Sequence, residues 1–117
     1  MNPVETWRAL DPGDLSRSWG VPLVETHGTI GSTSDRAAEL AGEGAPAWTV
    51  VVADAQTAGR GRRGAVWQSA SGVGLWMSWL GEGHLVAQLP LIVGVAAAEA
   101  IESVISGVVV AVKWPND

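Results

Sequence analysis

The chain has 117 residues, 47% of them hydrophobic, and a formal net charge of −5, so we expect one domain with a core of its own. It has no cysteine, which excludes disulfides, thiolate nucleophiles and cysteine-ligated metals and fits a reducing compartment. The acidic balance argues against a general nucleic-acid surface, because binding to phosphate backbones requires several clustered cations.

Residues 1–20 are expected to form an exposed lead-in. They carry Glu5, Asp11 and Asp14 and lack the basic start and apolar centre of a secretory signal. The longest apolar stretch, 85–101, is interrupted by polar residues, glycine and proline, so it predicts a buried helix and not a bilayer span. We therefore expect a soluble cytoplasmic protein with no membrane partner.

The rest of the chain predicts strands mixed with helices. Apolar and β-branched runs predict strands at 22–30, 48–53, 73–80 and 108–112. One helix is expected to begin at a cap formed by Ser32, Thr33 or Ser34 and to run through Leu40, and another to cover 90–105. This order predicts a mixed α/β, or α+β, fold in which helices pack on a sheet.

The segment 59–64, Gly-Arg-Gly-Arg-Arg-Gly, concentrates positive charge. Arg60, Arg62 and Arg63 are three of the seven basic residues in the chain. Guanidinium groups suit phosphate and carboxylate, and glycine lets the backbone approach a ligand closely. The segment therefore predicts a loop that binds one local anion, and the alternative is a solvated loop with incidental arginines.

The same residues match the G-x-G-x-x-G pattern of dinucleotide-binding turns. Such a turn requires a helix that begins at the third glycine and holds a pyrophosphate at its N-terminus. Residues 65–74 include two glycines and two serines, and each interior glycine costs a helix about 1 kcal/mol relative to alanine. Glu82 lies about where the ribose-binding acid would, but it stands between glycines as in a turn. We therefore favour the anion-binding loop.

Three segments together resemble the catalytic-domain signature of biotin protein ligases. They are GSTSD at 31–35, QTAGRGRRGAVW at 56–67 and KWPND at 113–117, in this order and at about these spacings. The resemblance covers residues 21–117 and implies part of a catalytic domain similar to class II aminoacyl-tRNA synthetases. Family members continue beyond this point, so the chain looks truncated, and we expect no DNA-binding role because only about 20 residues precede the first strand.

The resemblance implies a reaction in two steps. Biotin and ATP give biotinyl-5′-AMP and pyrophosphate, with Mg²⁺ accompanying the ATP, and the biotinyl group then passes to a lysine of a biotin carboxyl carrier protein. The alternatives are a truncated chain that binds biotin or the adenylate without transferring it, and a lipoate ligase-like enzyme. No residue is assigned as a metal ligand.

The resemblance also implies the site residues. Lys113, the only lysine, matches a residue that contacts the biotin carboxylate and the α-phosphate, and with Arg62 it is the expected catalytic pair. Ser34 replaces the usual asparagine, and Ala65 stands where a basic residue is common. A plain helix cap at the Gly-Ser-Thr turn and an ordinary half-buried Trp67 are the alternatives to ligand contact. The expected substrate-binding residues are Ser32, Thr33, Ser34, Gln56, Gly59, Arg60, Gly61, Arg62, Trp67 and Lys113.

Overall fold

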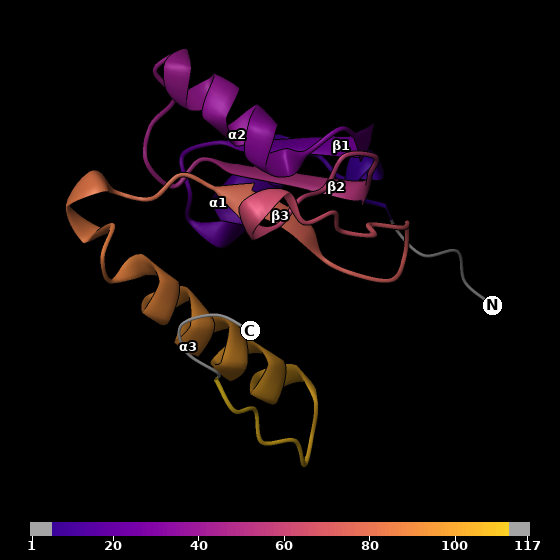
Figure 1. Cartoon of the computed structure of the whole chain (residues 1–117), viewed down its shortest axis with the longest axis vertical. Helices are drawn as coiled ribbons and strands as arrows, with labels where there is room; N and C mark the ends of the chain where they lie inside the picture. The colour runs from indigo at the N-terminus through magenta and orange to yellow at the C-terminus, as the bar shows by residue number, and fades with distance from the viewer. Residues whose placement is uncertain (1–5, 113–117) are drawn as a thin grey trace. The chain divides into compact units, whose positions relative to one another are not determined.

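The computed structural model describes residues 6–112, and the chain divides into two compact units at Leu80 and Gly81 (Figure 1). The first unit contains all the strands described, and the second contains a long helix. The elements in chain order are η1 (Trp7–Ala9), α1 (Pro12–Trp19), β1 (Val24–Ile30), α2 (Thr33–Gly42), β2 (Val50–Gln56), η2 (Arg62–Gly64), β3 (Trp76–Trp79), η3 (Gly83–Leu85) and α3 (Leu89–Val104).

The first unit is built on a three-stranded sheet in the order β1-β2-β3. β1 and β2 run parallel, with Val24 opposite Val50, and α2 makes the crossover between them. β3 pairs with β2 in the antiparallel sense, with Trp79 opposite Val50. The mixed fold expected from the sequence is confirmed.

Side chains of β2 alternate between two faces and form the core on both. Val51 packs with Ala37 and Leu40 of α2 on one face. Val50 and Val52 point to the other face, where they pack with Val24 and with the partly buried side chains of Trp7, Leu15, Val21, Met77 and Trp79. Burying a valine side chain stabilises the fold by about 1.5 to 3 kcal/mol, so β2 is the centre of the first unit.

The segment expected to be an exposed lead-in contains a helix. In α1, no residue is buried, and the Asp11 side chain caps the helix by accepting from the N–H of Asp14 at 3.0 Å. Trp7 and Leu15 nevertheless pack partly buried against the sheet, and the N–H of Trp7 donates to Asp54 Oδ1 at 2.8 Å. This segment therefore covers one face of the sheet, a role that the sequence analysis did not predict.

The strands expected at 22–30 and 73–80 are present but shorter, as β1 and β3, and the other two strand predictions differ more from the structure. The strand expected from Trp48 begins at Val50, because Trp48 has a left-handed φ of 70° that strands do not accommodate. The strand expected at 108–112 is wrong, since these residues pair with no strand in the described chain. Valine favours a strand only where a partner is in register, and here the N–H of Val110 donates to the Glu102 side chain at 2.8 Å.

The helix expected at 90–105 is present as α3, but its expected burial is not. Ala98 is the only buried residue of α3, and the side chains of Leu91, Ile92 and Val95 are more than two-fifths exposed. The helix is exposed because the described part of the second unit contains no strand that could cover it. α3 has 16 residues and is too short to cross a membrane. No other helix among residues 6–112 is long and apolar enough to cross one either.

A cluster of charged side chains links α2 to the edge strand β1 through ion pairs. Arg36 donates to both carboxylate oxygens of Glu25, from Nε at 2.6 Å and from Nη2 at 3.1 Å, and Nη1 donates to Glu39 at 3.0 Å. His27 Nε2 lies 2.6 Å from Glu25 Oε1. The hydrogen bonds from Arg36 lower the pKa of Glu25, with a further contribution from His27 that desolvation partly opposes. The ionised carboxylate is therefore favoured in the folded state.

We predict that the Glu25 cluster makes the first unit sensitive to acid. Because the folded-state pKa of Glu25 is lowered, its stabilisation is fully present above the ordinary glutamate pKa of about 4.3 and is lost as the pH falls through the lowered pKa. Urea unfolding of Glu25→Gln, followed by tryptophan fluorescence, should show a smaller free energy of unfolding than wild type at pH 7 and a vanishing difference in acid. Asp14→Asn is the control, because the Asp14–Arg17 pair is exposed.

Candidate functional site

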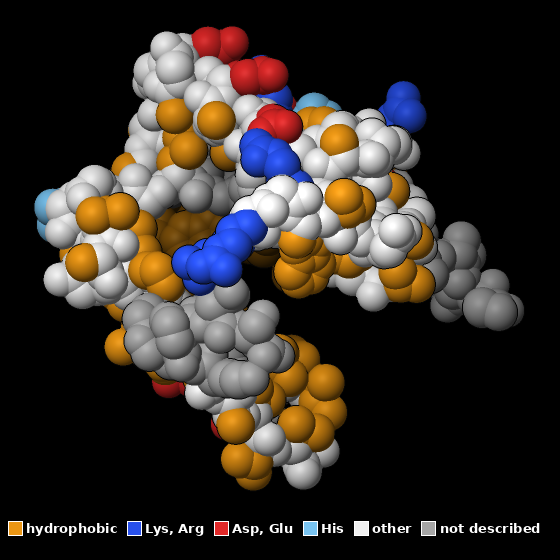
Figure 2. All heavy atoms as spheres, in the orientation of Figure 1, with side chains coloured by type: hydrophobic (Ala, Val, Ile, Leu, Met, Phe, Trp, Pro, Cys, Tyr) orange, Lys and Arg blue, Asp and Glu red, His pale blue; other side chains and the backbone are white. Residues whose placement is uncertain are grey.

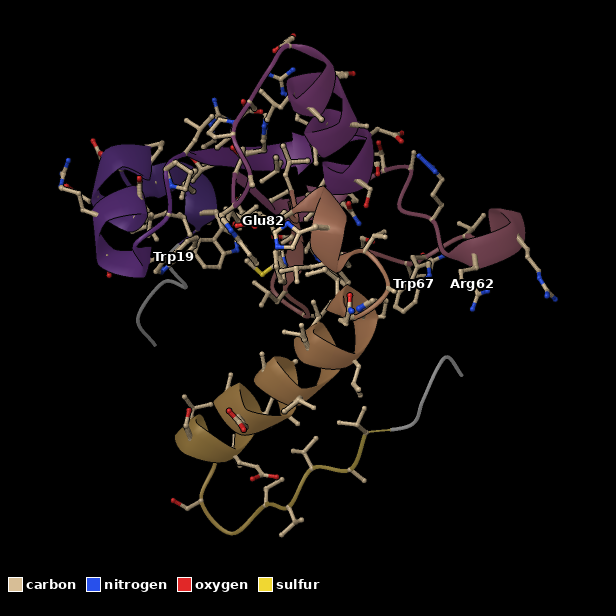
Figure 3. The ribbon with its side chains drawn as sticks, turned by 90° about the vertical axis from the view of Figure 1, so that its left-hand side faces the viewer. Trp19, Arg62, Trp67 and Glu82 are labelled. Atoms are coloured by element: carbon tan, nitrogen blue, oxygen red, sulfur yellow. The ribbon has the colours of Figure 1, made fainter. Side chains whose placement is uncertain are left out.

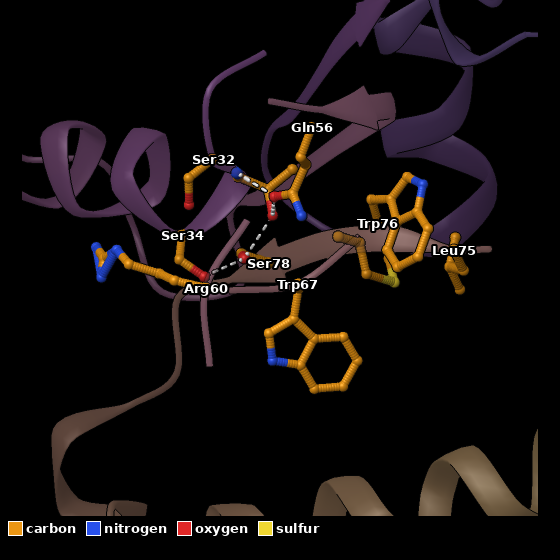
Figure 4. Close-up of a pocket in the computed structure, with 10 residues that line it drawn as sticks. Ser32, Ser34, Gln56, Arg60, Trp67, Leu75, Trp76 and Ser78 are labelled. Atoms are coloured by element: carbon orange, nitrogen blue, oxygen red, sulfur yellow. Dashed lines mark hydrogen bonds between the residues drawn. The ribbon is translucent and has the colours of Figure 1, made fainter. Parts of the chain in front are cut away.

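A cavity of about 190 Å³ lies beyond the carboxyl ends of β1 and β2, where ligands bind in many parallel sheets (Figure 4). The turn after β1 and the last residue of β2 supply its polar side, and the segment 75–78, which runs into β3, supplies the rest of its wall together with the glycine-rich loop. The lining residues are Ser32, Thr33, Ser34, Gln56, Arg60, Trp67, Leu75, Trp76, Met77 and Ser78.

The Gly-Ser-Thr turn starts α2 at the edge of the cavity. Ser32 has extended backbone angles and caps the helix, because its Oγ accepts from the N–H of Asp35 at 3.2 Å. The helix-cap alternative therefore describes the Ser32 hydroxyl, which also lines the cavity. Ser32 and Thr33 are only 4% and 3% exposed, so the backbone of this turn is well fixed.

Gln56 joins three segments of the chain at one carboxamide. Its Oε1 accepts from the backbone N–H of Thr33 at 2.7 Å and from the Thr33 hydroxyl at 3.1 Å. Its Nε2 donates to Ser69 Oγ at 3.1 Å, and its own backbone N–H donates to the Ser69 carbonyl at 3.0 Å. The end of β2, the start of α2 and the return of the glycine-rich loop are thus connected through this residue.

Ser78 of β3 extends this polar cluster, although the sequence analysis did not single it out. Its Oγ lies 2.8 Å from Thr33 Oγ1 and 2.9 Å from Ser34 Oγ (Figure 4). Pairing with Val51 places Ser78 on the face of the sheet that α2 covers. In the sequence, the available signal for this site residue was a serine hydroxyl between Met77 and Trp79. Only the register of β3 could have shown that this hydroxyl belongs to the site.

The glycine-rich segment is a hairpin-like loop. Bridges join Gln56 to Ser69 and Arg60 to Val66, and the N–H of Trp67 donates to the Gly59 carbonyl at 2.8 Å. The short helix η2 forms the tip of the loop. No α-helix of the described chain begins at the third glycine, so the dinucleotide-turn alternative lacks the helix that it requires.

The loop arginines differ in their surroundings. Arg60 forms an ion pair with Asp35 in the first turn of α2, with both side chains about half exposed, and its guanidinium points away from Trp67 (Figure 4). Arg62, which lies on η2 in Figure 3, is exposed, and so is Arg63. Neither forms an ion pair within residues 6–112. In Figure 2, basic side chains project in this region beside acidic side chains of α2. Two guanidinium groups are therefore available to a ligand from solution.

Trp67 forms part of an apolar wall of the cavity, with Leu75, Trp76 and Met77. Its side chain is 58% exposed, and its indole lies directly over Gly61, where a side chain would collide with it. Of the expected binding residues in the described range, those that line the cavity are Ser32, Thr33, Ser34, Gln56, Arg60 and Trp67. Gly59, Gly61 and Arg62 belong to the glycine-rich loop and do not line it. Lys113 lies outside the described residues.

We predict that Gly59→Ala disrupts the site specifically. A Cβ at Gly59 would lie 2.7 Å from Ser69 Oγ and 2.8 Å from Gln56 Nε2, so the Gln56–Ser69 hydrogen bond would have to shift. Overpacking of this kind costs about 1 to 3 kcal/mol of unfolding free energy, measured by urea titration. The control is Gly42→Ala in α2, where nothing lies within 4 Å and alanine favours the helix. Equal stability of the two variants would contradict the predicted crowding.

Comparisons of the chain with a family model, with known relatives and with solved structures all indicate the same family. Residues 29–117 match the Biotin/lipoate A/B protein ligase family. The chain is 44% identical over 95 residues to the bifunctional ligase/repressor BirA of Bacillus subtilis, which covers 78% of this chain and 29% of BirA.

Solved structures are similar in both fold and sequence. A biotin protein ligase from Aquifex aeolicus in complex with biotin and ATP superimposes with a TM-score of 0.68 and 36% identity, covering 80% of this chain and 40% of that one. The ligase from Leishmania major in complex with biotinyl-5-AMP gives a TM-score of 0.61 and 34% identity, covering 69% and 34%. The chain thus spans about three tenths of BirA and two fifths or less of the solved ligases.

Proposed function

Because the chain belongs to the biotin/lipoate A/B protein ligase family, we propose that it carries the biotin-activating site of a biotin protein ligase. In the proposed reaction the biotin carboxylate attacks the α-phosphate of ATP, giving biotinyl-5′-AMP and releasing pyrophosphate. A lysine amine of a biotin carboxyl carrier protein then takes the biotinyl group and releases AMP. The observation that carries the proposal is the polar cluster around Gln56 beside an apolar wall and an arginine-bearing loop.

The cavity suits an uncharged polar head with an apolar tail. Gln56 has a carboxamide that both donates and accepts, and the hydroxyls of Thr33 and Ser78 lie beside it, as a cyclic urea requires. Trp67, Leu75 and Met77 offer apolar surface for an aliphatic chain. A ligand with its head against Gln56 would extend its carboxylate toward the glycine-rich loop.

The loop supplies the charge that the first step needs. A carboxylate and an α-phosphate repel each other until cations neutralise them and hold them in line. We assign this role to Arg62 and Lys113, with Arg60 assisting. Arg60 is already paired with Asp35, but an exposed ion pair contributes only about 0.2 to 1 kcal/mol, and a hydrogen bond to a charged group contributes about 1.5 to 3 kcal/mol. An anionic ligand can therefore compete with Asp35 for Arg60.

Magnesium enters the proposal only with the nucleotide. Among residues 6–112 no group of three His, Asp or Glu side chains is placed to hold a metal ion, so we assign no protein ligands and no step to it. Bound to ATP, Mg²⁺ would neutralise part of the phosphate charge.

We predict that Arg62 contributes directly to adenylate binding. Calorimetric titration with a non-hydrolysable biotinyl-AMP analogue should give tight binding to the wild-type chain and binding about 10- to 100-fold weaker to Arg62→Ala, because a charge-assisted hydrogen bond to phosphate is lost. Arg17→Ala is the matched control, since Arg17 is an exposed arginine of α1 paired with Asp14. Equal weakening by both variants would mean that the effect is general electrostatics.

We predict that the chain catalyses biotin-dependent exchange of pyrophosphate into ATP and that Lys113→Ala abolishes it. Exchange measures adenylation alone and needs no acceptor protein. A chain that binds the analogue without exchange would support the binding-only alternative. Lipoate that displaces biotin, or drives exchange in its place, would support a lipoate ligase-like enzyme.

A further inference from the structure

Arg60 stands between the cavity and an acidic side chain of α2. It lines the cavity, yet its guanidinium points away from Trp67 and pairs with Asp35 in the first turn of α2 (Figure 4). Asp35 forms no other ion pair among residues 6–112, and the neighbouring Arg36 is engaged by the cluster that links α2 to β1. The chain itself thus supplies a carboxylate to the one arginine that lines the cavity.

This ion pair also connects the glycine-rich loop to α2. Among residues 6–112 it is the one side-chain hydrogen bond or ion pair that joins the segment 59–67 to that helix. The backbone hydrogen bonds of the segment are made within it, and a bridge to Val66 holds the backbone of Arg60. Replacing Asp35 by another anion therefore requires only a rotamer change of the exposed Arg60 side chain, which is a fast motion.

An anionic ligand must displace Asp35 before it can bind to Arg60. Both side chains are about half exposed, so the pair is screened by solvent and is weak enough to be replaced. A binding group that is free for only part of the time lowers the apparent affinity in proportion to the free fraction. For an exposed ion pair this amounts to about two- to fivefold for a ligand that uses Arg60. A ligand that does not use Arg60 loses nothing.

We infer that Asp35 is a specificity-determining residue that competes with the anionic group of the ligand for Arg60. This rests on the proposed function and concerns the regulation of the same site. A neutral ligand in the cavity leaves the ion pair intact, whereas a ligand carboxylate or phosphate takes the place of the Asp35 carboxylate on the guanidinium. Asp35 thus sets how much a negative charge on the ligand adds to its affinity.

Titration calorimetry on the full chain with two ligands tests this inference. One is the non-hydrolysable biotinyl-AMP analogue, and the other is biotin amide, in which a neutral carboxamide replaces the carboxylate. Asp35→Asn removes the charge and keeps the shape of the side chain. It should bind the analogue about two- to fivefold more tightly than wild type does, and biotin amide with unchanged affinity. The gain should shrink as salt is added, because salt already weakens the ion pair in wild type.

Three further variants separate the exchange at Arg60 from other effects. Asp14→Asn is the matched control, because Asp14 is also a first-turn aspartate with an exposed arginine partner, but in α1, and both affinities should stay unchanged. Asp35→Glu keeps the charge and should bind the analogue as wild type does. In an Arg60→Ala background, Asp35→Asn should give no gain, since no guanidinium is left to release and solvent screens the remaining charge.

The outcomes separate this inference from the proposed function. No binding of the analogue by the folded wild-type chain would overturn the proposed function, and the inference with it. Binding by wild type that Asp35→Asn does not strengthen would leave the proposed function standing and overturn the inference. A gain of the same size for biotin amide, or in the Arg60→Ala background, would also overturn it. Near-ultraviolet circular dichroism verifies tryptophan packing, and Asp35→Ser, which also removes the charge, replaces Asp35→Asn if that variant fails to fold.

Discussion

The hydrogen bond from the backbone N–H of Thr33 to the Gln56 carboxamide determines the geometry of the site. Thr33 is the first residue of α2 and is only 3% exposed, so its N–H is a helix-terminal donor that water reaches poorly. Leaving such a donor without a partner would cost about 1 to 3 kcal/mol. Gln56 ends β2, and the bond therefore keeps the end of the strand, the start of the helix and the cavity between them in one arrangement.

The site has two halves. The polar cluster around Gln56 is the fixed half, and the arginine-bearing loop is the half that makes few interactions. Around Gln56, the polar side chains hydrogen-bond to one another, so the wall has its shape before any ligand arrives. Arg62 and Arg63 are exposed at the tip of the loop, and Arg60 has an exposed partner that contributes little. The proposed recognition of an uncharged head by the fixed half, and of anionic groups by the arginines, is consistent with the chemistry of each half.

What the sequence could predict depended on how far apart the interacting residues are. The cap at Ser32, one of the three expected hydroxyls, follows from a local signal and is found. The end of β2 at Gln56 was not predicted, since the strand was expected to end at Ala53. Ser78 lies 45 positions from Thr33, and it joins the site only through the register of β3. The strand expected at 108–112 failed for the same reason, since valine content is local and a pairing partner is not.

The net charge of −5 does not oppose the binding of a nucleotide at this site. At physiological ionic strength the screening length is about 8 Å, so charges elsewhere on the surface contribute little to the potential at the cavity. Among residues 6–112, Asp35 is the acidic side chain that forms an ion pair with the loop, and it is paired with Arg60 before a ligand binds. An incoming phosphate therefore meets the field of Arg62 and Arg63, which form no ion pair among residues 6–112, and its binding should weaken with added salt because that field is exposed to solvent. The position of a few cations, and not the sum over the chain, decides which ligand the site attracts.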